Sequence, residues 1–133
     1  MNVIQESSLL LPMLIYIGWV VFLYSALTLV RAPDAWGIGR KADGKNPFAS
    51  IEPRITANLS NQFEWPILFY VICVLLIVEK NTDVIQLYLA WLFVAGRIFH
   101  SAVHILLSNI RLRGVVFTIN FIAVLAMWGA FLA

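Results

Sequence analysis

Four long apolar stretches, each about as long as a helix needs to cross a bilayer, constrain what this chain can fold into. They cover residues 9–30, 55–78, 84–110 and 114–133. About 20 apolar residues in a helix span the hydrocarbon core. Backbone polar groups in lipid must be satisfied within the segment, so each stretch is expected to be helical. The chain is 62% hydrophobic and only 12% charged, which excludes an ordinary soluble domain. The sequence therefore predicts an all-α integral membrane protein, a single four-helix bundle over residues 1–133.

Basic residues are unevenly distributed among the segments that connect these stretches. The second connection contains only Lys80. The first and third connections contain seven basic residues: Arg31, Arg40, Lys41, Lys45, Arg54, Arg111 and Arg113. Because basic loops favour the cytoplasm, we expect these two connections there and both termini on the non-cytoplasmic side. The net charge of +2 is too small to indicate a nucleic-acid partner.

The third apolar stretch contains three ionisable residues, Arg97, His100 and His104. Their spacing of i, i+3 and i+7 places them on one helical stripe about 60° wide. Each ionisable group in hydrocarbon costs roughly 2.5–3.5 kcal/mol on insertion scales and is usually retained for a partner or a function. This face of the helix is therefore expected to contact protein or water, and it is the first candidate for a functional site.

A second polar stripe begins the second stretch. It consists of Arg54, Asn58, Asn61 and Glu64, and Pro66 follows at once, where a kink is expected. With the predicted topology, Asn61 and Glu64 lie roughly 10–15 Å from the cytoplasmic end of their helix. The two histidines lie at a similar depth, roughly 9 Å for His104 and 15 Å for His100. The polar residues of three helices, with Arg113 at the start of the fourth, should meet in one layer.

Several functions fit such a layer. It can be a structural network in which Glu64 neutralises Arg97, or part of a small proton-linked transporter. A metal site fits poorly, because neighbouring arginines repel a cation. Arginines bind carboxylates and phosphates bidentately, so the layer suits a small zwitterionic anion, while apolar helix walls suit a lipophilic partner.

Three motifs, in order along the chain, resemble those of the MAPEG family, the membrane-associated proteins in eicosanoid and glutathione metabolism. The first is N-x-x-E followed by proline, at Asn61, Glu64 and Pro66. The second is G-R-x-x-H, from Gly96 to His100, and the third is Arg113, sixteen residues after Arg97. The resemblance covers about residues 54–118 and the four-span layout.

The resemblance implies a homotrimer of four-helix subunits that binds glutathione between neighbouring subunits. Arg113 matches the arginine that stabilises the glutathione thiolate, and His104 is the second candidate catalytic residue. By position, the glutathione pocket would contain Arg31, Arg54, Asn61, Glu64, Arg97 and His100. No metal is implied, and glutathione serves as co-substrate.

Two positions depart from the family pattern. Ala57 stands where an arginine is common, and His104 where a tyrosine is common. The favoured function is a glutathione-dependent transferase or peroxidase acting on lipophilic electrophiles. The alternative is a non-catalytic lipid-binding or scaffold member of the same family, which the two departures favour.

Overall fold

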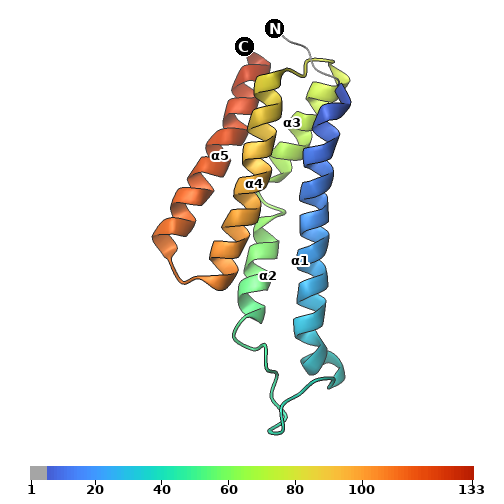
Figure 1. Cartoon of the computed structure of the whole chain (residues 1–133), viewed down its shortest axis with the longest axis vertical. Coiled ribbons are helices and arrows are strands. Elements are labelled where there is room, and N and C mark those ends of the chain that lie inside the picture. Colours follow the sequence, from blue (N-terminus) through green and yellow to red (C-terminus); the bar gives the residue numbers. More distant parts are fainter. Residues whose placement is uncertain (1–5) are drawn as a thin grey trace.

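The computed structural model describes residues 6–133 and is all-helical (Figure 1). A short 3-10 helix, η1, leads into the first of the long helices. The elements are η1 (Glu6–Leu9), α1 (Leu10–Trp36), α2 (Glu52–Asn61), α3 (Ile67–Val78), α4 (Val84–Leu106) and α5 (Ile110–Leu132). The helical segments Ser7–Trp36, Val84–Leu106 and Ile110–Leu132 are long and apolar enough to cross a membrane. The chain is a multi-pass integral membrane protein.

The second predicted segment is two helices, which corrects the expectation of four continuous ones. The chain unwinds between Asn61 and Ile67, and α3 continues along the bundle beyond α2 (Figure 1). Pro66 has no N–H and its ring crowds the preceding turn, so a kink was expected here and the structure has a full break. The Gln62 and Phe63 amides close short turns to the carbonyls of Leu59 and Ser60, at 3.0 and 3.1 Å.

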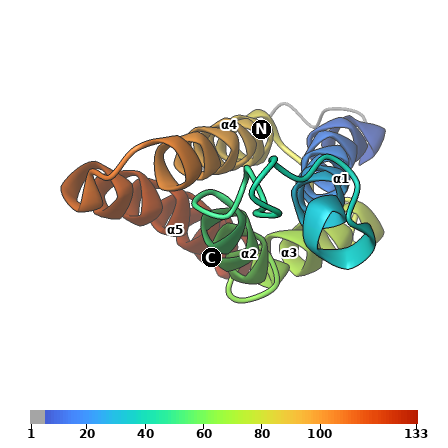
Figure 2. The same cartoon turned by 90° about the horizontal axis from the view of Figure 1, so that it is seen from below.

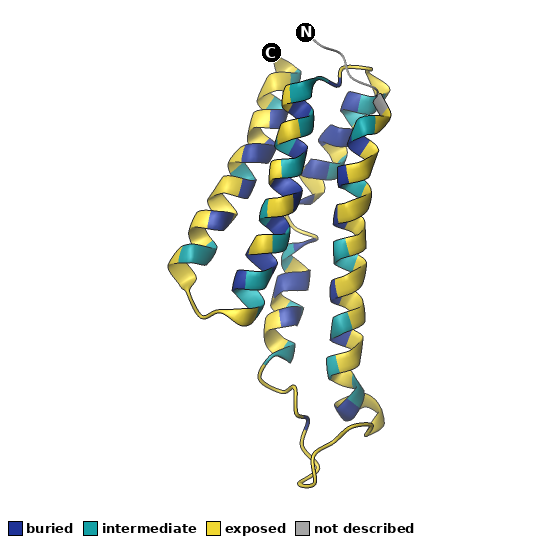
Figure 3. Ribbon diagram, in the orientation of Figure 1, coloured by how far each residue is buried: buried dark blue, intermediate teal, exposed yellow. Residues whose placement is uncertain are grey.

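The break separates two hydrophobic clusters. The larger one includes Tyr16, Phe69, Phe93 and Met127 and joins η1, α1, α3, α4 and α5. The smaller consists of Leu23, Leu27, Ile55 and Leu59, and joins α1 to α2. Buried side chains lie on the inward faces of the helices, and the outward faces are exposed and mostly apolar (Figure 3). Those outward faces are suited to lipid contact.

Two connections lie at the same end of the bundle (Figure 1). The α4–α5 connection is short, and Asn109 caps α5 by accepting a hydrogen bond from the Leu112 amide at 3.0 Å. The α1–α2 loop is longer, and it is folded back on α1 by the buried Asn46. The Asn46 amide donates to the Val30 carbonyl at 2.9 Å and to Asp34 at 2.7 Å.

Candidate functional site

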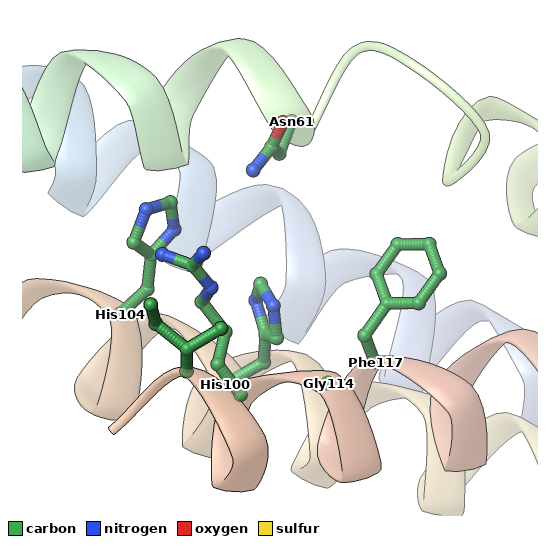
Figure 4. Close-up of a pocket in the computed structure, with 7 residues that line it drawn as sticks. Asn61, His100, His104, Gly114 and Phe117 are labelled. Carbon is green, nitrogen blue, oxygen red and sulfur yellow. The ribbon is translucent and has the colours of Figure 1, made fainter. Parts of the chain in front are cut away.

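A pocket of about 280 Å³ opens between α2, α4 and α5. Its lining residues are Asn61, His100, His104, Ile110, Arg113, Gly114 and Phe117. Figure 4 shows Asn61 reaching from α2 towards the two histidines of α4, with Gly114 and Phe117 on α5. Four of the residues singled out from the sequence, Asn61, His100, His104 and Arg113, therefore line one pocket.

The helices and the α4–α5 connection position these four side chains. His100 and His104 are one helical turn apart, and their ring centroids are 5.8 Å apart. The amide nitrogen of Asn58 lies 3.3 Å from Nδ1 of His104, which fits an amide donating to a neutral imidazole. Because the α4–α5 connection is only three residues long, it brings Arg113, in the first turn of α5, to the same pocket.

A buried hydrogen-bond network lies beside the pocket and is centred on Gln62. Its side-chain oxygen accepts from the Tyr16 hydroxyl at 2.6 Å and from Arg97 Nε at 3.3 Å. Its amide nitrogen donates to the Asn58 carbonyl at 3.2 Å and to the Ser101 hydroxyl at 3.4 Å. Gln62 thereby links α1, α2 and α4 in a low-dielectric interior, where satisfied networks are strong. Our sequence reasoning did not identify Gln62, Tyr16 or Ser101.

Arg97 is fully buried and only partly satisfied. Its guanidinium carbon lies 5.4 Å from the centre of the Trp65 ring. Within residues 6–133, Nη1 and Nη2 of Arg97 and Nδ1 of His100 have no hydrogen-bond partner. Glu64 is exposed in the break and forms no salt bridge with Arg97 in the described part of the chain. Buried donors of this kind gain strongly from an acceptor, above all an anionic one.

Arg31 and Arg54 lie away from this pocket. Arg31 Nε contacts the Glu52 carboxylate at 2.7 Å, and Arg31 Nη2 donates to Thr56 at 3.1 Å. The hydrogen bonds from Arg31 and Thr56 hold the pKa of the Glu52 carboxyl below its ordinary value. Arg54 Nη1 donates to the Ile105 carbonyl at 3.3 Å and lines a different pocket.

Asn120 on α5 is a further buried polar residue that sequence reasoning missed. A Cβ added to Gly96 would lie 1.8 Å from Asn120 Oδ1, so the glycine of the G-R-x-x-H motif makes room for this amide. Neither amide atom of Asn120 has a hydrogen-bond partner within the described residues. The close approach sets the spacing of α4 and α5 one residue from Arg97, and hence the shape of the pocket.

Comparison with known families gives one finding. The model of the MAPEG family matches residues 9–133. No curated protein and no solved structure was found to match the chain.

Proposed function

The chain belongs to the MAPEG family, and from this premise we propose that it is a membrane-bound, glutathione-dependent transferase or peroxidase acting on lipophilic electrophiles. Membership supports a membrane function related to glutathione or eicosanoid metabolism. The finer proposal is carried by one observation, the shared pocket of Asn61, His100, His104 and Arg113.

The donor set of the pocket fits a peptide with a thiol and two carboxylates. Asn61 and His100 offer hydrogen bonds at the pocket wall. Arg97, whose Nη1 and Nη2 have no partner within residues 6–133, belongs to the same stripe of α4 as His100. Arg113 supplies a cation at the pocket. A cation beside a thiol favours the thiolate, which is the nucleophile. His104, partly exposed at the same pocket, is the proposed donor that orients the sulfur.

The reaction proposed for a transferase is a displacement. The thiol loses its proton to solvent or to a neutral histidine, and the sulfur forms a bond to the electrophilic carbon. The leaving group departs with its bonding electron pair. With a lipid hydroperoxide, the thiolate attacks the terminal oxygen and the O–O bond breaks, which gives glutathione sulfenic acid and a lipid alkoxide. The alkoxide takes up the proton that the thiol lost and leaves as the lipid alcohol. A second glutathione then attacks the sulfenic sulfur, giving glutathione disulfide and water.

We propose that subunits share this site in a homotrimer. Glu64, which the resemblance assigns to the glutathione amino group, is exposed outside the pocket of its own chain. A neighbouring subunit would bring such a carboxylate, or Arg31, within reach of bound glutathione. Light scattering of the protein in several mild detergents tests the assembly, and a monomeric mass in all of them would contradict it.

The activity is tested with the detergent-purified protein, glutathione and either a generic aryl halide or a lipid hydroperoxide. Turnover of either substrate, abolished in Arg113→Ala, supports the proposal. Glutathione binding without turnover of either would instead favour a lipid-binding or scaffold protein. That alternative is retained because Ala57 and His104 replace an arginine and a tyrosine common in the family.

A further inference from the structure

A second pair of hollows lies between α1, α2 and α4, largely on the opposite side of α4 from the pocket of Arg113. Figure 2 shows these three helices seen from the loop end of the bundle. One hollow is an apolar groove of about 270 Å³, with walls formed by Trp19, Phe22, Leu23, Ala26, Ile55 and Ala102. Ile105 and Leu106 line this groove and also a pocket of about 220 Å³ that contains Ser50 and Arg54. The two hollows therefore adjoin, and together they are apolar at one end and cationic at the other.

Specific side-chain contacts fix the walls of the apolar groove. Trp19 is held by a hydrogen bond from Nε1 to the Ser101 hydroxyl at 3.1 Å, and its ring stacks on Phe22 with centroids 5.1 Å apart. Ala26 and Ala102 leave the space between these helices open because their side chains are short. Phe22 is 55% exposed, so the groove opens sideways to the surrounding lipid.

The cationic end offers a free guanidinium edge. Arg54 Nη1 donates to the Ile105 carbonyl, and the remaining nitrogens make no hydrogen bond within residues 6–133. The side chain is exposed. A planar guanidinium fixed at one nitrogen is well suited to bind a phosphate through the others, and the Ser50 hydroxyl lies in the same pocket.

The order of these features along the bundle matches that of a bilayer lipid. From Trp19 to Ala26 the groove follows α1 for about 10 Å towards the end that has the α1–α2 and α4–α5 connections. Seven of the nine Lys and Arg residues of the chain lie at this end. Polybasic segments at a membrane surface attract anionic headgroups.

We propose that this groove is a binding site for one anionic phospholipid of the surrounding bilayer. Its phosphate binds Arg54 and one acyl chain lies along Trp19, Ala26 and Ala102. Because the site is on the far side of α4 from Arg113, the lipid is a structural ligand that braces α1 against α2 and α4. It is not the lipophilic substrate of the proposed reaction.

The test uses the full chain in phosphatidylcholine nanodiscs and brominated lipids, since bromine quenches tryptophan fluorescence on contact. Brominated phosphatidylglycerol is titrated against brominated phosphatidylcholine, and the Trp19 signal is isolated by difference from Trp19→Phe. We expect Trp19 quenching to saturate at an about fivefold lower mole fraction of phosphatidylglycerol, the effect of about one cation at a membrane surface. Arg54→Gln should make the two curves coincide. Arg111→Gln, a matched change at the same end outside the groove, should leave the preference intact.

Ala102→Phe fills the groove and should remove the saturable quenching while circular dichroism shows unchanged helix content. The proposal is wrong if the wild-type curves coincide, or if Arg54→Gln and Arg111→Gln weaken the preference equally, which would indicate a general surface-charge effect. It is also wrong if unbrominated oleate relieves the quenching more effectively than unbrominated phosphatidylglycerol, because the occupant is then a free fatty acid. A change of oligomeric mass in Ala102→Phe without lipid-dependent quenching would assign the groove to a neighbouring subunit.

Discussion

Replacing Gly96 with alanine is the sharpest test of how α4 and α5 are spaced beside the candidate site. The new Cβ would lie 1.8 Å from Asn120 Oδ1 and 2.9 Å from its Cγ. An ordinary carbon–oxygen contact is about 3.3 Å or longer, so the amide must retreat by more than an ångström. Asn120 is fully buried, so its side chain must repack within a close-packed interior or α5 must move.

The expected change in the free energy of unfolding follows from two opposing effects. Overpacking of a close-packed interior costs about 1–3 kcal/mol, while alanine gains about 1 kcal/mol over glycine in a helix interior. Gly18→Ala in α1 is the matched control, because a Cβ there would meet nothing within 4 Å. We expect Gly96→Ala to be less stable than Gly18→Ala by about 1–3 kcal/mol, the clash alone.

Equilibrium unfolding in mixed micelles of mild detergent and dodecyl sulfate measures both variants. Asn120→Ala, combined with Gly96→Ala, should remove the clash, so the double variant should be more stable than additivity allows. Because any displacement of α5 also moves Arg113, Gly96→Ala should lower turnover as well if the helix gives way. If Gly96→Ala and Gly18→Ala unfold at the same detergent composition, the close approach of Asn120 does not set the spacing of α4 and α5.

Three further outcomes are expected. Arg113→Ala should lower kcat strongly with little loss of glutathione affinity, because it removes an interaction that matters mainly for the reactive thiolate. Kinetics and calorimetry measure the two quantities, and full turnover would make this arginine an ordinary interface anchor. Gln62→Leu should destabilise the fold by roughly 2–5 kcal/mol, since it removes the hydrogen-bond acceptor of buried Arg97, whereas Gln62→Glu keeps an acceptor and should lose less in the same unfolding assay. The Glu52 carboxyl has a lowered pKa because Arg31 binds its charged form, so the pair stabilises the fold above the usual carboxyl pKa of about 4.3. That contribution should fade as pH falls below this value, and in Glu52→Gln the pH dependence of unfolding should be weaker.

The sequence predicts the helical membrane architecture well because length and hydropathy decide it. All-helical membrane architecture is confirmed, and Pro66 correctly marks the interruption of the second segment. The size of that interruption was not predictable, because it depends on Gln62, whose side chain satisfies the freed carbonyl of Asn58 and Arg97 at once. A pattern along one helix does not reveal such contacts between helices.

The candidate site, too, was predictable where it depends on a pattern along one helix and unpredictable where it depends on contacts between helices. Periodicity identified His100 and His104 as one stripe, and chain order placed Arg113 at the start of the next helix. The sequence could not place Arg31, because its partner Glu52 is 21 positions further along the chain. The loop between them follows a path that depends on the buried Asn46. Asn120 escaped notice because a single asparagine in an apolar run has no periodic partner, and only the packing on Gly96 shows its importance.

The unwound turn between α2 and α3 divides the bundle into two parts that are packed differently. The end built on α3 rests on the large aromatic cluster around Phe69 and Phe93. The ten-residue α2 is held instead by the smaller aliphatic cluster that it shares with α1 and by the polar contacts of Gln62 at its C-terminal end. We therefore expect α2, which bears Asn61, to adjust to a bound ligand more readily than α3, which would have to repack the aromatic cluster. Mutant libraries intended to change the ligand preference are therefore best directed at residues 54–61 of α2, and α3 is best left unchanged.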